Sequence, residues 1–342
     1  MTKLRLRGKM LALLLGALVI IQGSIVAYTA LTVRTNAIDQ ATKLVLASSR
    51  EEAEVLSKTM TRIVVTAQNV AAALEKCNRT APEARKDVLN MVREALVQTP
   101  GTLAIWFVFE PNAFDGKDAE FAGLDGFQET GRFEGNFIRN GDSILRTYDN
   151  TEEAINDGDW YTGTFSTGRP HLAEPYAYSY IDGGEEYFMT SVSIPIKRSG
   201  ETIGVVGMDI DLEMFAKEVA GISVTEHDYS CLFSNEGCLL AHPNEAFIGK
   251  SLKEIGGGKI KNLDKVLNLI AEGGKAIHVE YSLELEEDAL KAQIPVSLGT
   301  GLAPWGLAVV VPLSDVTAAP NRLIRNLILT SLLGLVLLGL VI

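Results

Sequence analysis

The sequence predicts an α+β protein in which two mixed modules follow one long N-terminal helix and lie between two transmembrane helices. Residues 10–33 and residues 326–342 contain no charged side chain, which predicts the two spans. As a helix, the first run exceeds the roughly 30 Å hydrocarbon thickness of a membrane. Between the spans, helical periodicity is followed by turn-linked strand patterns, and the order of hairpin, helix and closing strands then recurs. Such an order is typical of helices packed on antiparallel sheets.

The N-terminal residues 1–9 carry four basic side chains and are predicted to form a cytoplasmic tail. By this charge bias, the region after Arg34 lies outside the cytoplasm, as the periplasmic or extracellular part of a multi-pass inner-membrane protein. A cleavable signal peptide is the alternative for the first run, although a cleaved signal usually has an apolar core of roughly 7–15 residues. The second run, 17 residues long, is at the lower limit for a span and either continues past Ile342 or ends there.

Residues 34–79 are predicted to form a long stalk helix, because apolar residues recur there in alternating steps of four and three. This stripe fits a helix packed on its own module and equally a dimer seam. The motif Thr80-Ala81-Pro82-Glu83 has the pattern of a capping box with proline in the first turn, and it predicts the start of a second helix. The stripe consists of Leu56, Met60, Ile63, Ala67, Val70 and Leu74.

Residues 80–218 are predicted to form a membrane-distal module and residues 219–320 a membrane-proximal one. Runs rich in β-branched and aromatic residues predict the strands, and Asn140-Gly141, Asp182-Gly183-Gly184 and Ser199-Gly200 predict tight turns between them. Distal strands are expected at 102–110, 133–139, 143–148, 176–181, 187–196 and 202–209. After a helix at 212–220, the proximal module is expected to have strands at 228–233, 238–242, 276–283, 292–296 and 305–311 and a helix at 263–271.

The composition excludes several classes of function. The net charge of −12, from 31 basic and 43 acidic residues, comes without a basic stripe, so nucleic acid is not an expected partner. Three cysteines are too few for a disulfide scaffold, although a bond between Cys231 and Cys238 is left open. His171 and Glu174 have helical spacing, but prolines bracket them, so no metal site is predicted. Because no catalytic or phosphate-binding motif is complete, we expect no enzyme activity and no cofactor.

Short motifs follow one another over nearly the whole chain. They are Asp159-Trp160-Tyr161, Ile194-Pro195-Ile196, Gly204-Val205-Val206-Gly207-Met208-Asp209-Ile210, Ser234-Asn235-Glu236-Gly237, Ala241-His242-Pro243-Asn244 and Trp305-Gly306-Leu307. In their order and spacing, the chain resembles the double-Cache sensory region of bacterial methyl-accepting chemotaxis proteins, which also occurs in sensor kinases and cyclic-di-GMP enzymes. The resemblance implies two PAS-like modules on one long helix, a small-molecule ligand in the distal module, a homodimer, and a cytoplasmic kinase and adaptor as signalling partners.

The resemblance also implies a ligand pocket. Positions that line the pocket of amino-acid-binding members are matched by Trp160, Tyr161, Tyr176 and Asp209. Two positions depart from the pattern, because Gly158 stands where those members have an arginine and Tyr178 where they have an aspartate. An arginine clamps a carboxylate through two parallel charge-assisted hydrogen bonds, which a glycine cannot do. An acidic residue among aromatic faces favours an amine or an amino-acid-like ligand.

Other interpretations of these residues stay open. Trp160 and Tyr161 also fit a role as core aromatics, and Asp209 fits a cap for the helix at 212–220. Arg169 or Arg146 could replace the missing clamp, which would make the region a carboxylate sensor. The same region could serve as the input domain of a sensor histidine kinase or a cyclic-di-GMP enzyme. The candidate ligand-binding residues are Trp160, Tyr161, Tyr176, Tyr178, Asp209, Asp159, Trp106 and Arg169.

Overall fold

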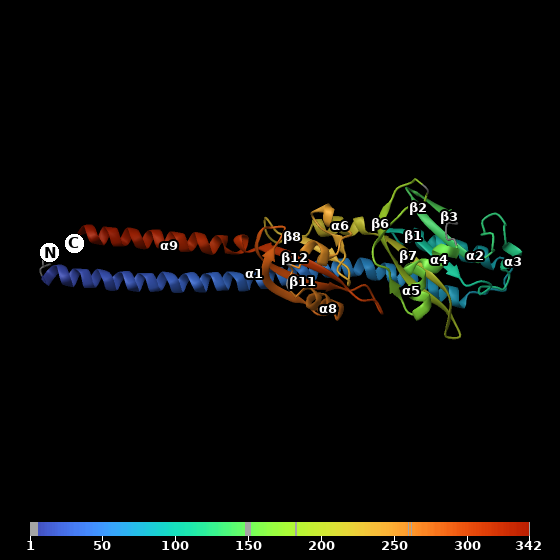
Figure 1. Ribbon diagram of the computed structural model, residues 1–342, viewed down its shortest axis with the longest axis horizontal. Helices are drawn as coiled ribbons and strands as arrows, with labels where there is room; N and C mark the ends of the chain where they lie inside the picture. The colour runs from blue at the N-terminus through green and yellow to red at the C-terminus, as the bar shows by residue number, and fades with distance from the viewer. Residues whose placement is uncertain (1–5, 148–151, 182, 259, 261, 342) are drawn as a thin grey trace.

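The structure is a computed structural model that describes residues 6–147, 152–181, 183–258, 260 and 262–341. Its longest element is α1 (Leu6–Lys76), whose 71 residues extend over about 105 Å at 1.5 Å per residue. The second long helix is α9 (Leu313–Val341), which packs against α1. Figure 1 shows both helices projecting side by side from one end of the molecule, with the two termini together at their tips. The rest of the chain is folded around the other half of α1.

Both long helices have the length and composition needed to cross a membrane, and their most apolar windows are not buried in the protein. Residues 10–33 lie within α1, so the predicted first span and the stalk form one uninterrupted helix. The predicted second span lies within α9, which begins directly after the last strand and contains Pro320. The two helices therefore connect the folded part to both predicted spans without an intervening loop.

The distal module holds a seven-stranded antiparallel sheet. Its strands run in the order β3-β2-β1-β7-β6-β4, and β5 also pairs with β6. The elements are α2 (Ala84–Val97), β1 (Thr102–Phe109), α3 (Asp118–Phe121), β2 (Glu134–Asn140), β3 (Ser143–Thr147), α4 (Glu152–Asp157), α5 (Asp159–Thr167), β4 (His171–Leu172), β5 (Tyr176–Tyr178), β6 (Tyr187–Arg198) and β7 (Glu201–Asp211).

The proximal module holds a five-stranded antiparallel sheet in the order β10-β11-β12-β8-β9. In both modules, a closing strand (β7 or β12) lies between the opening strand (β1 or β8) and the strand that precedes it in the chain (β6 or β11). The elements are α6 (Leu212–Ala220), β8 (Tyr229–Phe233), β9 (Leu239–Ala241), the 3₁₀ helix η1 (Glu245–Phe247), α7 (Leu252–Gly256), α8 (Leu263–Ala271), β10 (Ala276–Ser282), β11 (Glu287–Val296) and β12 (Trp305–Pro312).

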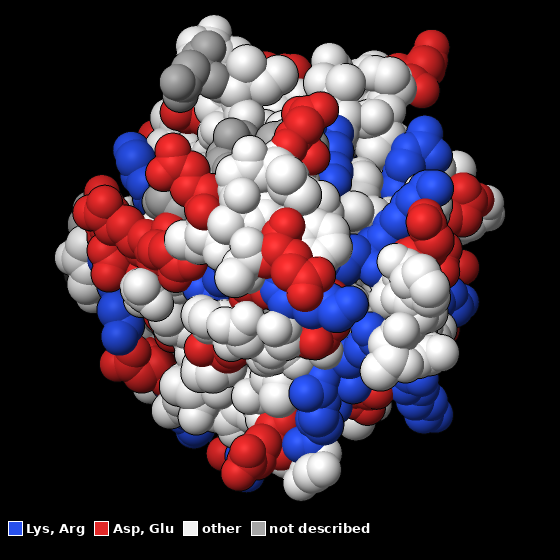
Figure 2. Space-filling model, turned by 90° about the vertical axis from the view of Figure 1, so that its right-hand side faces the viewer, with Lys and Arg blue, Asp and Glu red and all other residues white. Residues whose placement is uncertain are grey.

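One apolar core joins α1 to both sheets. The six residues of the predicted helical stripe are all buried, with at most 6% of any side chain exposed. Burying an aliphatic side chain of this size contributes roughly 1.5–3 kcal/mol to folding. Of the two interpretations of the stripe, packing on the helix's own modules is therefore the correct one. Figure 2, which views the end formed by the distal module, shows acidic and basic side chains interspersed there without a continuous basic surface.

The predicted capping box is wrong. The second helix begins at Ala84, and the side chain of its N-cap residue Glu83 makes no capping hydrogen bond. The Thr80 hydroxyl donates to the Asn78 side chain at 2.8 Å instead, within the turn that follows α1. A local turn partner therefore satisfies this hydroxyl, and the helix starts one turn later than the motif predicts.

The two cysteines of the proximal module are not bonded to each other. Cys231 and Cys238 are free thiols, so the disulfide left open by the sequence is not formed. Cys231 is buried in the proximal module, and Cys238 forms an isolated bridge with Ser251. Tyr148 and Asp182, at the ends of predicted strands and turns, lie outside the described residues.

Candidate ligand-binding pocket

A pocket lies on the face of the distal sheet that is turned away from α1. Along β1, Ile105 points into the core shared with α1, so its neighbour Trp106 faces the opposite side. The strand register pairs Trp106 with Gly207, and Asp209, two residues further along β7, faces the same side. A Cβ atom at Gly207 would lie 2.1 Å from the Trp106 indole. Only glycine at this position lets the indole lie flat across the sheet.

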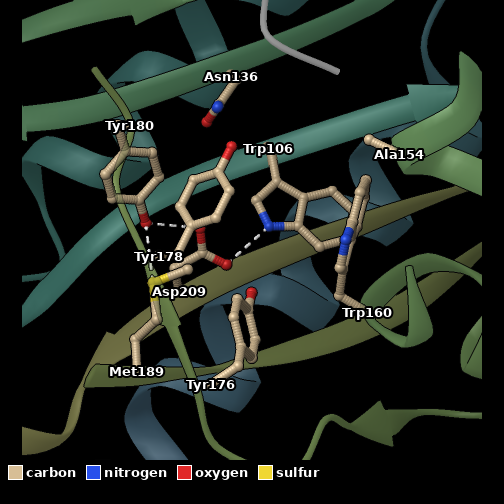
Figure 3. Close-up of a pocket in the computed structure, with 9 residues that line it drawn as sticks. All are labelled: Trp106, Asn136, Ala154, Trp160, Tyr176, Tyr178, Tyr180, Met189 and Asp209. Carbon is tan, nitrogen blue, oxygen red and sulfur yellow. Dashed lines mark hydrogen bonds between the residues drawn. The ribbon is translucent and has the colours of Figure 1, made fainter. Parts of the chain in front are cut away.

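Asp209 lies at the centre of this pocket (Figure 3) and is 4% exposed. Its Oδ1 accepts hydrogen bonds from Trp106 Nε1 at 2.8 Å and from Ser191 Oγ at 2.6 Å. Its Oδ2 accepts one from the Tyr180 hydroxyl at 2.7 Å. The Tyr176 hydroxyl lies 2.6 Å from Ser191 Oγ, so it joins the same network. Residues from four segments of the distal module therefore hold one carboxyl group in place.

The electrostatic setting of Asp209 follows from this burial. Burial raises the pKa of the carboxyl, and the hydrogen bonds from Ser191, Trp106 and Tyr180 oppose that rise. The pKa of Tyr180 is also raised, by burial first and then by the nearby carboxylate. A cation entering the pocket would favour the charged carboxylate. The alternative role of Asp209 as a helix cap is wrong, because Asp211 caps α6 by accepting from the Glu213 backbone N–H.

Aromatic rings form the walls of the pocket. Trp160, in the first turn of α5, meets Trp106 edge to face, with ring centroids 4.7 Å apart and planes at 79°. Tyr176 and Tyr178 of β5 are followed by Tyr180, and the rings of Tyr178 and Tyr180 are 5.1 Å apart at 83°. Edge-to-face pairs are the arrangement that ring quadrupoles favour. Five aromatic side chains thus surround the carboxyl, each able to contribute roughly 0.5–2 kcal/mol to binding a cation.

The structure explains why position 158 is a glycine. The Trp160 indole folds back over Gly158, so that a Cβ atom there would lie 2.2 Å from Trp160 Nε1. Any side chain at position 158 would therefore collide with the indole at its first atom. The tryptophan wall and an arginine clamp at this position exclude each other in the observed arrangement.

The remaining lining adds acceptors and apolar surface. Asn136 of β2 is 5% exposed, and its Oδ1 has no hydrogen-bond partner among the described residues. Met189 and Ala154 complete the lining, which contains neither lysine nor arginine among the described residues. The cavity measures about 60 Å³. Because ligand pockets usually measure roughly 300–1,000 Å³, a ligand of more than a few heavy atoms must widen this one.

Comparison with known proteins shows what this region is similar to. Residues 88–217 match the family described as "Methyl-accepting chemotaxis protein-like, first PDC sensor domain". Over 266 residues, or 72% of this chain, the sequence is 28% identical to the methyl-accepting chemotaxis protein TlpQ of Pseudomonas aeruginosa. The two modules thus have the double-Cache fold, and in sequence they are similar to the sensory regions of bacterial chemoreceptors. This chain spans about a third of the length of that receptor, 35% of it.

Solved structures share the fold of the double-Cache region. The extracellular domain of mmHK1S-Z3, a protein assigned as a histidine kinase, is 24% identical with a TM-score of 0.67, and the match covers 84% of this chain and 98% of that one. The ligand-binding domain of the Pseudomonas aeruginosa chemoreceptor PctB, solved with L-Gln, is 16% identical with a TM-score of 0.54 and coverage of 80% and 92%. These matches show that two modules on one long helix are a fold shared with those domains.

The double-Cache region brings most of the candidate residues together and leaves three elsewhere. The Tyr161 ring lies beside the pocket, in an apolar cluster behind Trp160, and its hydroxyl donates to Glu110. Asp159 is exposed, and its carboxylate lies 2.7 Å from His171 Nε2. Arg169 is exposed after the end of α5. The candidates that line the pocket are Trp106, Trp160, Tyr176, Tyr178 and Asp209.

Neither arginine that could replace the missing clamp reaches this pocket. Arg169 is not among the lining residues. Arg146 is paired with Phe137 across β2 and β3, on the sheet face that belongs to the core shared with α1. Its guanidinium lies over the Phe127 ring, 5.6 Å from the centroid. The structure therefore gives no support to a carboxylate clamp made by either residue.

Four lining residues were missed by sequence reasoning. Tyr180 continues the alternation of Tyr176 and Tyr178, so the period of two along the chain was a signal that could have found it. The contributions of Asn136, Met189 and Ala154 depend on strand register and on how α4 covers the sheet. No local pattern in the sequence predicts those contacts.

Proposed function

We propose that the double-Cache region is the extracytoplasmic sensor of a transmembrane chemoreceptor and that its distal module binds a small organic amine. The observation that supports the amine is the chemistry of the pocket lining, which offers acceptors and aromatic faces and no basic side chain among the described residues. An ammonium group would donate to Asp209 and to the unpartnered Asn136 Oδ1 while its charge contacts the rings. A ligand carboxylate would instead face Asp209 with no cation to compensate it.

An amine fits this pocket better than an amino acid does. The related PctB domain was solved with L-Gln. In this chain, Gly158 supplies no guanidinium, and the Trp160 indole lies against the position of a Cβ atom at this residue. The same pocket keeps its acidic end, because Asp209 is held by three donors from the protein. The residues that would recognise an ammonium are therefore present, and those that would recognise a carboxylate are not among the described lining.

Ligand binding would favour a wider arrangement of the pocket than the one described. An ammonium that donates hydrogen bonds to Asp209 competes with Tyr180 and Ser191 for the same oxygens, and the small cavity must widen to admit it. Asp209 lies near the end of β7, which continues into α6 and the proximal module. A ligand shifts such an equilibrium only through unequal affinity for the two states.

The proposal includes a topology and partners. Residues 1–9 are assigned to the cytoplasm, 10–33 and 326–342 to the spans, 34–79 to the stalk, and 80–218 and 219–320 to the two modules. The receptor would act as a homodimer that signals to a cytoplasmic kinase and adaptor. An output domain of the histidine kinase or cyclic-di-GMP class is the alternative. The chemoreceptor is favoured because the match to a chemotaxis protein extends over 72% of the chain.

The decisive experiment compares three ligands that differ by one group. The full chain, purified in detergent, is titrated by calorimetry with butylamine, with norvaline, which adds a carboxylate, and with pentanoate, which keeps the carboxylate and lacks the amine. We expect butylamine to bind and the other two to bind at least tenfold more weakly. Tighter binding of norvaline or pentanoate would show that the pocket recognises a carboxylate.

Matched variants assign any binding to this pocket. Trp160→Ala removes one ring and Tyr281→Ala removes an exposed ring in the proximal module, where 52% of the side chain is accessible. Butylamine binding should weaken in the first variant and stay unchanged in the second. Equal binding in both would place the amine site elsewhere.

A further inference from the structure

The proximal module contains a cavity of about 340 Å³ on the sheet face turned away from α1. Tyr229 and Cys231 of β8 share this face with Lys291 of β11, because Tyr229 and Lys291 both pair with Val310 of the strand between them. Leu232, which directly follows Cys231, points instead into the core shared with α1. This cavity therefore occupies the same face of its module as the amine pocket does in the distal module. It is also large enough for a small organic molecule.

The two cavities differ in charge. In the distal module the closing strand β7 contributes Asp209, whereas the closing strand β12 contributes Val310 to the proximal face. The basic residue of the proximal cavity is Lys291 on the neighbouring strand. Among the described lining residues the acidic one is Glu284, which is exposed in the turn between β10 and β11. The inner part of the proximal cavity thus has an ammonium group, paired with Glu280, where the distal pocket has a carboxyl group.

Lys291 is largely buried, with 13% of its side chain exposed. Its Nζ lies 3.3 Å from Glu280 Oε2 and 3.0 Å from the Tyr281 carbonyl oxygen. An ammonium group has three N–H donors, and these two contacts use two of them. Among the described residues, no further acceptor contacts the third. A ligand oxygen in the cavity is the partner that this donor could take.

The walls of the cavity are aromatic and apolar. The His242 ring lies between Tyr229 and Phe247, with centroids 5.4 Å and 5.2 Å away. Burial lowers the pKa of His242, which keeps the imidazole neutral near pH 7. Burial also raises the pKa of the Cys231 thiol to about 12, so the thiol stays protonated. Leu239, Leu252 and Ile255 add aliphatic surface to this neutral wall.

We propose that this cavity is a second ligand site, which binds a small aromatic or branched monocarboxylic acid. Its carboxylate accepts a charge-assisted hydrogen bond from Lys291 Nζ, and its apolar body packs against Tyr229, His242 and Phe247. The site recognises the opposite charge to the amine pocket. The site consists of proximal residues alone, so it does not depend on what the distal module binds.

The test uses benzoate as the probe and the full chain in detergent. Binding is measured by calorimetry, with benzyl alcohol and benzylamine as neutral and cationic compounds of the same size. We expect benzoate to bind once per chain, and the two other compounds to bind at least tenfold more weakly. No benzoate binding, or equal binding of all three compounds, would overturn the proposal.

Variants locate the benzoate site. Lys291→Met should weaken binding at least tenfold, whereas Lys253→Met, which changes an exposed lysine paired with Asp264, should not change it. Leu252→Trp fills the cavity with Lys291 intact and should abolish binding, which keeps the test valid if Lys291→Met misfolds. Trp160→Ala, in the distal pocket, should leave benzoate binding unchanged. The proximal site would be contradicted if Trp160→Ala lost benzoate binding, or if Leu252→Trp still bound benzoate.

Discussion

Glu174 of the distal module accepts a hydrogen bond from the Ser234 hydroxyl of the proximal module at 2.7 Å. Glu174 lies two residues before Tyr176, which lines the distal pocket, and Ser234 directly follows β8. Burial raises the pKa of the Glu174 carboxyl, and the Ser234 hydrogen bond opposes that rise. This contact therefore links the segment that carries the pocket tyrosines to the first strand of the other module.

A double-mutant cycle should show that Glu174 and Ser234 are energetically coupled. Glu174→Gln and Ser234→Ala should each destabilise the full chain, and the double variant should lose about 1 kcal/mol less than the sum of the two. Urea unfolding followed by circular dichroism gives the three values. If the effects simply add, the hydrogen bond contributes nothing to the link between the modules.

Asp209→Asn should separate ligand binding from stability. Amine affinity should fall roughly 10- to 100-fold, because a hydrogen bond to a charged group contributes about 1.5–3 kcal/mol. The raised pKa of Asp209 means that the folded state holds this proton more tightly than the unfolded state does. Protonated Asp209 therefore stabilises the folded chain fully below about pH 4, the pKa of an aspartate in the unfolded chain. This stabilisation is lost as the pH rises through the pKa of Asp209 in the folded chain.

The pH dependence supplies the control for that variant. The stability of Asp209→Asn relative to the unchanged chain should rise as the pH increases above about 4, since asparagine has no charge to bury. Thermal unfolding at several pH values without ligand measures this difference. A difference that stays constant with pH would mean that the buried carboxyl does not titrate differently in the folded state.

Gly158→Ala should displace the Trp160 indole, because the new Cβ atom would collide with it. We expect butylamine affinity to fall about tenfold, while stability changes by about 1 kcal/mol or less because the ring can rotate outward. In a Trp160→Ala background the same substitution should have no further effect on affinity. A further loss there would show that Gly158 acts on the pocket through something other than the indole.

The thiol of Cys231 should resist alkylation in the folded chain. Its pKa of about 12, raised by burial, leaves very little thiolate at pH 8, against an ordinary cysteine pKa of about 8.5. N-ethylmaleimide should modify it more than a hundredfold more slowly than the same cysteine in urea, as followed by mass spectrometry of peptides. Rapid modification would show that the proximal module opens often.

Local chemistry in the sequence predicted much of the fold. The strand that ends at Phe109, the Asn140-Gly141 hairpin and the helices Leu212–Ala220 and Leu263–Ala271 are all present, because periodicity and turn residues are strong local signals. The strand predicted at 292–296 begins earlier, at Glu287. The polar residues at its start obscure the strand pattern, while pairing with β10 and β12 supports it.

The pocket could be predicted only in part. Trp160, Tyr176 and Asp209 were found through a resemblance, and the structure places all three in the lining. Tyr161 was expected beside Trp160, but neighbouring residues on a helix point in different directions, so one ring faces the pocket and the other lies behind it. Which side chains meet across the sheet depends on register, as for Asn136, and a single sequence does not contain that information in any local pattern.

The uninterrupted course of α1 has a consequence for how the region unfolds. The two sheets are separate, but they share one apolar core along the same helix, from Val45 to Leu74. Removing one module would expose part of the apolar face of α1 to water, so neither module is expected to fold by itself. Both modules should melt in a single cooperative transition, and a protease should find no stable half of the molecule to release.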